Sequence, residues 1–161
     1  MRKYWLVPVL VATLAAVWAW TASATDGPGT LTLIEVSLPK NDRPLGDFTF
    51  DRPPVSGDRF VVKNALFEKG RRVGRVEVLH TFITGFGPTF ARKATVLFVA
   101  QLFVRGGTIL AEGYGQVVAD GPAKLTFPIV GGTGRYADVR GSINVRTLTE
   151  NKTRLDLALL P

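Results

Sequence analysis

The residues most suggestive of chemistry lie in the segment TFPIVGGTGRYADVRGSINV, residues 126–145. An apolar stretch runs into glycines with the spacing Gly131-x-x-Gly134-x-x-Ala137, which is close to the fingerprint that seats a pyrophosphate at a helix N-terminus. That site needs a helix and further parallel strands after the glycines. Residues 139–147 instead alternate between two kinds of side chain, which predicts a strand. We therefore do not expect a dinucleotide site.

A single carboxylate, Glu35, stands among leucines in the run LTLIEVSL. Strict alternation puts Leu31, Leu33 and Glu35 on one side of a predicted strand. If that side faces an enclosed interior, desolvation raises the pKa of Glu35, whereas a nearby arginine would lower it. The carboxyl group could then act as a base or contact a charged ligand. The alternative is a glutamate that faces solvent.

Residue types exclude several other kinds of site. The chain has no cysteine and one histidine, His80, so thiolate chemistry is excluded and the fold cannot rely on disulfide bonds. No spacing of Asp, Glu and His matches HExxH or a calcium loop, and no serine stands in a nucleophile elbow. We expect neither a metal nor a cofactor. His80 is either a core packing residue or a polar group of the site.

The charge of the chain is modestly basic. It carries 20 Lys and Arg against 13 Asp and Glu, for a formal charge of +7. The basic residues are scattered, apart from Arg71-Arg72 and Arg92-Lys93, which are typical of exposed turns. We expect no nucleic-acid partner.

The N-terminus predicts a secretory leader. Two basic residues precede the apolar run 5–20, and the small-x-small signal Ala22-Ser23-Ala24 follows. The run is short for a membrane-spanning helix. We expect residues 1–24 to be a cleaved signal peptide and residues 25–161 to form one secreted domain, with a permanent membrane anchor as the alternative.

From residue 29 onward, the sequence predicts strands separated by turns. Val, Ile, Phe and Thr dominate the strand segments, turns are rich in Gly, Pro, Asn and Asp, and helical periodicity is absent. The expected strands are residues 31–38, 59–67, 75–82, 94–104, 108–119, 123–130, 139–149 and 153–160. Eight such strands favour an all-β fold, an eight-stranded antiparallel up-and-down barrel with a ligand-sized lumen, over a β-sandwich. The glycines of residues 131–134 would then form a turn.

Three segments resemble the allene oxide cyclase and dirigent protein superfamily and its bacterial barrel-like relatives. They are FPIVGGTGRYADVRG, GDRFVVKNALFEKGRRVG and GGTILAEGYG. The resemblance implies an eight-stranded antiparallel barrel, commonly trimeric. Its lumen would hold a hydrophobic oxygenated substrate and direct the cyclisation or coupling of that substrate.

The resemblance also implies site residues in the first half of the chain. In the run LIEVSLPKNDRP, Glu35 corresponds to the catalytic glutamate of the cyclases and Pro44 corresponds to a proline of their site. Ser37 takes the place of an asparagine. Asn64 falls on a second polar group, which in the cyclases helps to hold a water against the epoxide oxygen. His80 replaces a cysteine of the lumen and Val62 replaces an aromatic residue, differences that point away from allene oxide as the substrate.

Arg140, in the phrase YADVRG, matches an arginine of the dirigent proteins. There it follows the GGTG loop and is thought to manage a quinone methide intermediate. An ion pair with Glu112 or Asp138 is the alternative role for Arg140. The resemblance thus implies catalysis by Glu35 and Arg140.

The leading interpretation is a secreted, cofactor-free barrel that binds a small apolar oxygenated molecule and guides its cyclisation or isomerisation. The residues expected to bind the substrate are Ser37, Pro44, Val62, Asn64 and His80. We also expect a homotrimer, and no membrane contact once the leader is removed. The alternatives are a non-catalytic barrel that carries a lipid or secondary metabolite, and a structural cell-surface protein whose lumen is filled by its own side chains.

Overall fold

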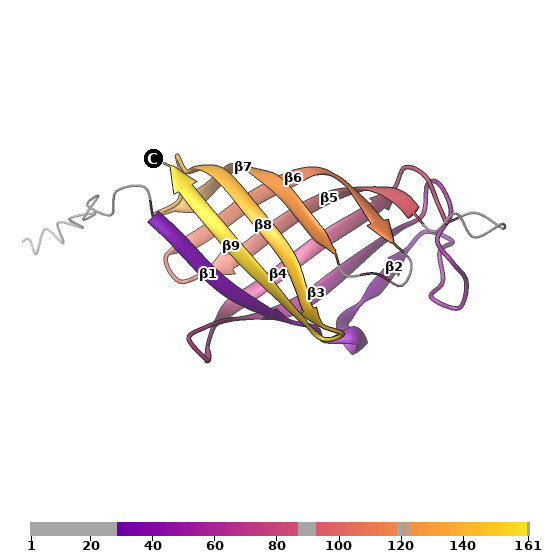
Figure 1. Cartoon of the computed structure of the whole chain (residues 1–161), viewed down its shortest axis with the longest axis horizontal. Helices are drawn as coiled ribbons and strands as arrows, with labels where there is room; N and C mark the ends of the chain where they lie inside the picture. Colours follow the sequence, from indigo (N-terminus) through magenta and orange to yellow (C-terminus); the bar gives the residue numbers. More distant parts are fainter. Residues whose placement is uncertain (1–28, 87–92, 119–120, 122, 161) are drawn as a thin grey trace, which may run out of the picture.

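Long alternating strands form one antiparallel sheet that closes on itself (Figure 1). The computed structural model describes residues 29–86, 93–118, 121 and 123–160, so the predicted leader lies outside the described residues. The elements are β1 Gly29–Val36, η1 Pro39–Asn41 (a 3-10 turn), β2 Arg43–Leu45, β3 Arg59–Glu68, β4 Arg71–Phe82, β5 Lys93–Val104, β6 Gly107–Val118, β7 Lys124–Gly134, β8 Arg140–Thr149 and β9 Lys152–Leu160. In this part of the chain, no helix is long and apolar enough to cross a bilayer.

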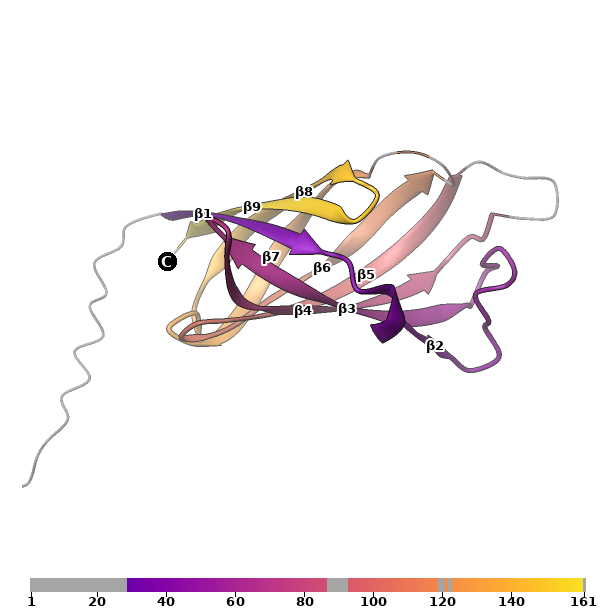
Figure 2. The same cartoon turned by 90° about the horizontal axis from the view of Figure 1, so that it is seen from below.

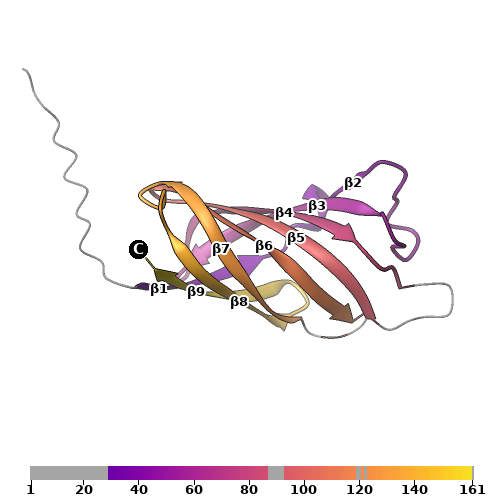
Figure 3. The same cartoon turned by 90° about the horizontal axis from the view of Figure 1, so that it is seen from above.

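The strand order is that of an up-and-down barrel. The sheet runs β1-β9-β8-β7-β6-β5-β4-β3-β2, and a further pairing of β1 with β3 closes it. Figure 3 shows the long strands β5 to β8 running obliquely around the barrel. The predicted eight-stranded antiparallel barrel is confirmed, and the sandwich alternative is wrong.

The short strand β2 is an addition that the sequence pattern did not predict. It pairs with the beginning of β3, where Pro44 lies opposite Phe60. A three-residue strand that contains proline is too short to show alternation, and its proline cannot donate to a ladder. Figure 2 shows β2 and the loop after it extending beyond one end of the barrel.

The interior of the barrel is filled by one layer of side chains after another. Val76 on β4 pairs with Leu102 on β5, which pairs with Ile109 on β6. All three side chains are at most 2% exposed. Burying such an aliphatic side chain stabilises the fold by roughly 1.5–3 kcal/mol. The inward side chains of the alternating strands therefore form the packed centre of the barrel, while the strands themselves form its wall.

The glycine segment of residues 131–134 is the end of β7 and not the predicted turn. Gly132 pairs with Ile109 and Gly134 with Gly107 of β6, and the turn to β8 lies at residues 135–138. At Gly134, which has a φ of +62°, a Cβ would stand 2.2 Å from the carbonyl oxygen of Gly106. Glycine is needed here because the two backbones approach so closely.

Candidate functional site

Glu35 lies on the inward side of β1, near the end of that strand. It shares this side with Leu31 and the fully buried Leu33, both of which belong to the packed interior. On either side of β1, Glu35 pairs with Thr153 of β9 and Leu66 of β3. The barrel therefore places one carboxyl group in a wall that is otherwise apolar.

Asn64 on β3 holds this carboxyl group in place. Its Nδ2 donates a hydrogen bond to Oε1 of Glu35 at 2.5 Å, and its Oδ1 accepts one from the backbone N–H of Leu38 at 3.0 Å. Among the described residues, Asn64 is the one polar or charged residue that is buried, at 7% exposure. Because both ends of the amide are used, the side chain has one orientation and presents a donor to Glu35.

The surroundings favour the protonated form of Glu35. Burial raises the pKa of this carboxyl group, the hydrogen bond from Asn64 opposes the rise, and the nearby charge of Asp42 adds to it. Burial likewise raises the pKa of Asp42, against a backbone hydrogen bond from Lys63. A carboxyl group with a raised pKa in an apolar wall can exchange a proton with a substrate at milder pH than an exposed one.

Asp42 is not among the residues that the sequence predicts for the site. It follows η1, and its Oδ1 is buried without a hydrogen-bond partner in the described structure. Only its place beside Pro44, in the run LPKNDRP, could have drawn attention to it. Its effect on Glu35 depends on how the connection between β1 and β2 folds back along β3.

A groove of about 420 Å³ leads to Asn64 from outside the barrel. It lies where the pairing of β1 with β3 ends, after Val36. The other residues that line it are Leu38, Asn41, Lys63, Arg72, Arg75 and Glu77. Glu77 forms ion pairs of 3.2 Å with both Lys63 and Arg75. The groove gives a ligand a polar, charged approach to Asn64, whose amide holds Glu35, although Glu35 itself does not line the groove.

His80 belongs to a column of aromatic rings in the same interior. Its ring stacks on Phe60 at 4.5 Å and 7°, and meets Phe98 edge to face at 4.9 Å. Burial lowers the pKa of His80 to about 4, with a backbone hydrogen bond to Val78 acting in the opposite direction. Its Nδ1 is buried, with no partner in the described structure. A neutral imidazole packed in this way matches the core-packing role better than that of a proton donor.

The column continues to the end of the barrel beyond which β2 and the loop after it extend. Phe48 stacks on Phe60 at 5.7 Å, and Phe50 meets Phe60 at 5.5 Å. At the other end of the column, Phe98 contacts Phe127 at 5.1 Å. An aromatic surface thus runs from the loop after β2 into the barrel, which the sequence pattern did not indicate, since Phe48 and Phe50 lie outside the predicted strands.

The remaining residues implied in the first half of the chain surround this arrangement. Val62 shares the inward parity of Phe60 and Asn64, and stands between them on β3. Ser37 donates its backbone N–H to the carbonyl oxygen of Asn151 at 2.9 Å, and Pro44 is exposed on β2. The structure brings Glu35 and Asn64 into contact, with Val62 beside Asn64, while Ser37 and Pro44 lie at the edges. In the described residues, no three His, Asp or Glu side chains gather as metal ligands would.

Residues 40–159 match the family described as the allene oxide cyclase barrel like domain. The chain belongs to this family. The match includes β2 to β8 and nearly all of β9, while Glu35 lies just before its first residue. None of the curated proteins matches the sequence.

Several solved structures have a similar fold, and their names describe different activities. Pyocyanin demethylase has a TM-score of 0.63 and 21% identity, over 81% of this chain and 99% of that chain. An exo-specific intermolecular Diels-Alderase has a TM-score of 0.60 and 17% identity, over 83% and 98%. A pterocarpan synthase dirigent protein has a TM-score of 0.60 and 15% identity, over 81% and 92%. At such identities the similarity shows the fold alone.

Arg140 of this allene oxide cyclase-like barrel lies on the outer face. It is exposed at the beginning of β8, and its Nη1 donates to the carbonyl oxygen of Val139 at 2.9 Å. The inward positions of this strand belong to its neighbours Gly141 and Ile143. The ion pairs of the described residues do not include one from Arg140 to Glu112 or Asp138. The structure does not bring Arg140 to Glu35.

Proposed function

We propose that this barrel binds a small apolar oxygenated molecule and guides its cyclisation or isomerisation. The observation that carries the proposal is the Glu35 carboxyl group, which is held by Asn64 in an apolar interior with a raised pKa. Burying a polar or ionisable group costs stability unless it is well paired. Functional sites are where such perturbed groups concentrate.

In the proposed mechanism, the substrate enters through the groove at Asn64, is ordered against the apolar wall around Glu35, and Glu35 acts on its oxygen. Protonated Glu35 donates a hydrogen bond to a carbonyl or epoxide oxygen, where negative charge develops during reaction. Asn64 keeps the carboxyl group in one orientation, so no reorganisation is needed as the charge develops. Holding a flexible molecule in a reactive conformer supplies several kcal/mol of barrier lowering, and the acid adds roughly 10²–10⁴-fold in rate.

Three of the structural neighbours support this reaction class through their names, whereas the demethylase does not. One is described as a heme-binding cyclase that catalyses a [4 + 2] cycloaddition, another as a Diels-Alderase and a third as a pterocarpan synthase. These names describe those proteins. They support the proposal that a barrel of this kind can order an apolar molecule for ring formation.

Replacing Glu35 with Gln tests the proposal. We expect turnover to fall about a hundredfold because the amide is a far weaker acid and hydrogen-bond donor than a carboxylic acid, while folding persists because Gln still accepts from Asn64. Product formation from a panel of small apolar epoxides and conjugated ketones, followed by chiral liquid chromatography and mass spectrometry, measures this. Glu112→Gln, an exposed change on β6, is the matched control.

Two outcomes would count against catalysis. One is equal turnover by the parent and the Glu35→Gln variant. The other is a ligand that co-purifies unchanged with both proteins and is never converted. In the same assay Arg140→Leu tests the catalytic role that the resemblance implies for Arg140. From its outward position, we expect this variant to keep the turnover of the parent.

A non-catalytic binding barrel is the second candidate function. The groove at Asn64 favours it, because a carrier needs a place for its ligand. The filled interior, in which Leu33, Leu102 and Ile109 are at most 1% exposed, is instead what the structural-protein alternative expects. Both grooves larger than 300 Å³ described for this structure include outward-facing charged residues. A carrier would then hold its ligand near the groove at Asn64 and release it unchanged.

We further propose that the domain is exported after removal of its leader and assembles as a trimer. Exposed apolar side chains on the outer face support a subunit contact, among them Tyr114 at 66% and Val118 at 41% exposure on β6. Native mass spectrometry of protein expressed with its leader reports the cleaved mass, the number of subunits and any retained ligand together. A full-length monomer would contradict both inferences.

A further inference from the structure

Three basic side chains stand side by side on the outer face of the barrel. Lys124 on β7 pairs with Arg146 on β8, and Arg146 pairs with Arg154 on β9. Neighbouring strands lie about 4.8 Å apart, so the three positions span roughly 10 Å. We call these three residues the basic row. Like charges directly opposite one another in a sheet are destabilising, so the row needs a compensating negative charge.

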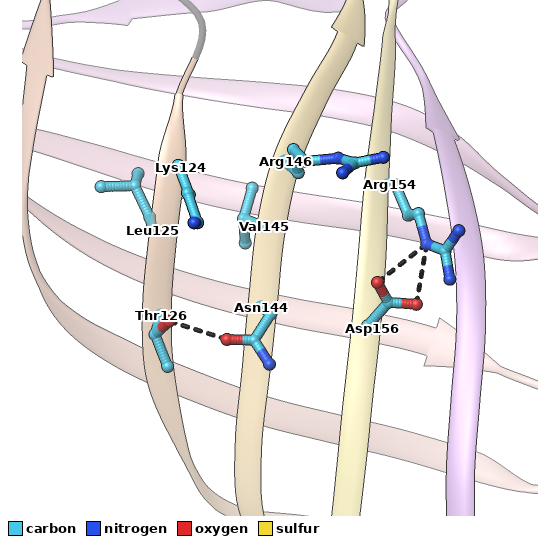
Figure 4. Close-up of a pocket in the computed structure, with 8 residues that line it drawn as sticks. All are labelled: Lys124, Leu125, Thr126, Asn144, Val145, Arg146, Arg154 and Asp156. Atoms are coloured by element: carbon cyan, nitrogen blue, oxygen red, sulfur yellow. Dashed lines mark hydrogen bonds and ion pairs between the residues drawn. The ribbon is translucent and has the colours of Figure 1, made fainter.

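The basic row lines a groove of about 320 Å³ (Figure 4). The other residues that line it are Leu125, Thr126, Asn144, Val145 and Asp156. Asp156 is the one carboxylate among them. It accepts from Nε of Arg154 through both oxygens, at 2.9 and 2.8 Å, and from the hydroxyl of Thr32 at 2.7 Å. This carboxylate is already committed to one member of the row.

The groove therefore keeps an excess of positive charge. Hydrogen bonds from Thr32 and Arg154, together with the charge of Arg146, lower the pKa of Asp156, which stays ionised at neutral pH. One carboxylate then faces three cations. In the described structure neither Lys124 nor Arg146 forms an ion pair.

A neutral pair on the same strands adds hydrogen-bonding capacity. The hydroxyl of Thr126 donates to Oδ1 of Asn144 at 2.7 Å, which leaves Nδ2 of Asn144 as a further donor beside the groove. Figure 4 shows this pair next to Lys124 and Arg146, two residues further along β7 and two residues earlier on β8. Cationic groups and an amide donor within one concave surface are what an oxyanion requires.

We propose that this groove binds a multiply charged oxyanion of the phosphate class, carried by a phosphate ester or by a phospholipid headgroup. A guanidinium binds phosphate oxygens in a bidentate manner, and Lys adds a point charge. A single carboxylate ligand would neutralise only part of the excess charge. The groove is on the outer face while Glu35 faces the interior, so this site and the proposed catalytic function can fail independently.

Calorimetric titration of the intact protein with inorganic phosphate and pyrophosphate tests the site. We expect saturable binding and a higher unfolding temperature in phosphate than in sodium chloride of equal ionic strength. Arg146→Gln should weaken binding by about tenfold or more, because a charge-assisted contact is lost. Arg71→Gln is the matched control, since it removes the same charge from an exposed position at the beginning of β4.

Vesicle sedimentation then separates the two sources of phosphate. Phosphatidylcholine vesicles with and without phosphatidic acid provide the probes. Sedimentation that needs phosphatidic acid and Arg146 assigns the headgroup, while phosphate binding without sedimentation assigns a soluble ester. The proposal is overturned if neither probe binds, or if Arg146→Gln and Arg71→Gln change binding equally.

Discussion

A Gly141→Ala variant is expected to lose more than about 4 kcal/mol of its free energy of unfolding, a large part of the roughly 5–15 kcal/mol typical of folded domains. Gly141 has a φ of +132°, and a Cβ built there would stand 1.9 Å from the carbonyl oxygen of Ala158. The obstacle is backbone on the adjacent strand, so no rotamer change relieves it. Gly141 also pairs with Ile129 on its other side, which holds β8 in place from both directions.

Gly57→Ala is the matched control for this variant. Gly57 has a φ of +90°, but nothing lies within 4 Å of the position that its Cβ would take. Only backbone strain remains, at roughly 1–2 kcal/mol. Urea denaturation followed by circular dichroism measures both. Similar losses in the two variants would show that strain dominates, and that the close approach of β8 and β9 does not matter.

A His80→Phe variant is expected to lose the acid sensitivity that the buried imidazole gives the parent. The pKa of His80 is about 4 in the folded protein against 6.5 ordinarily, so between these values the unfolded chain binds the proton more readily. The contribution of the neutral His80 side chain to the free energy of unfolding is therefore complete above pH 6.5 and falls as the pH drops to about 4. Linkage sets the loss at about 3 kcal/mol. Phenylalanine keeps the stacking on Phe60.

The measurement is the free energy of unfolding of both proteins between pH 7 and pH 4. The difference between parent and variant isolates His80, because Glu35 and the other carboxyl groups titrate in both proteins. Glu35, whose pKa is raised, acts in the opposite sense and stabilises the fold as pH falls towards 4.5. Parallel pH curves for the two proteins would mean that the imidazole is more hydrated than its packing indicates.

Alternation along the strands predicts the all-β fold and places Glu35 on the same side as Leu31 and Leu33, but it does not decide whether that side faces the interior or solvent. Each strand carries that information locally, because the side chains of a strand alternate between two faces. The contact of Glu35 with Asn64 is different, since these residues are 29 positions apart in the sequence and meet only through the register between β1 and β3. No local pattern sets that register. The role of Asp42 depends in the same way on how the chain folds back after β1.

The sequence indicates the structure of the glycine segment and of Arg140 only in part. The glycines of residues 131–134 have turn-like composition, yet they serve a close approach of β6 and β7 within a ladder. For Arg140, the signal was present in the sequence. The alternation that puts Ile143 and Val145 on one side of the strand puts Arg140 on the other side, with Asn144 and Arg146. Arg140 matches the family phrase YADVRG, but its parity places the side chain on the outer face of the barrel.

The closure of the barrel has consequences for how its interior can be reached. β1 forms three residue pairs with β3, between Ile34 and Val36, but eight with β9. The β1 to β3 ladder is therefore the weakest seam around the circumference, and a local opening of the wall would begin there at the lowest cost. Glu35 lies in the middle of that seam. A ligand that enters through a local opening of this short ladder would therefore reach the buried carboxyl group of Glu35 first.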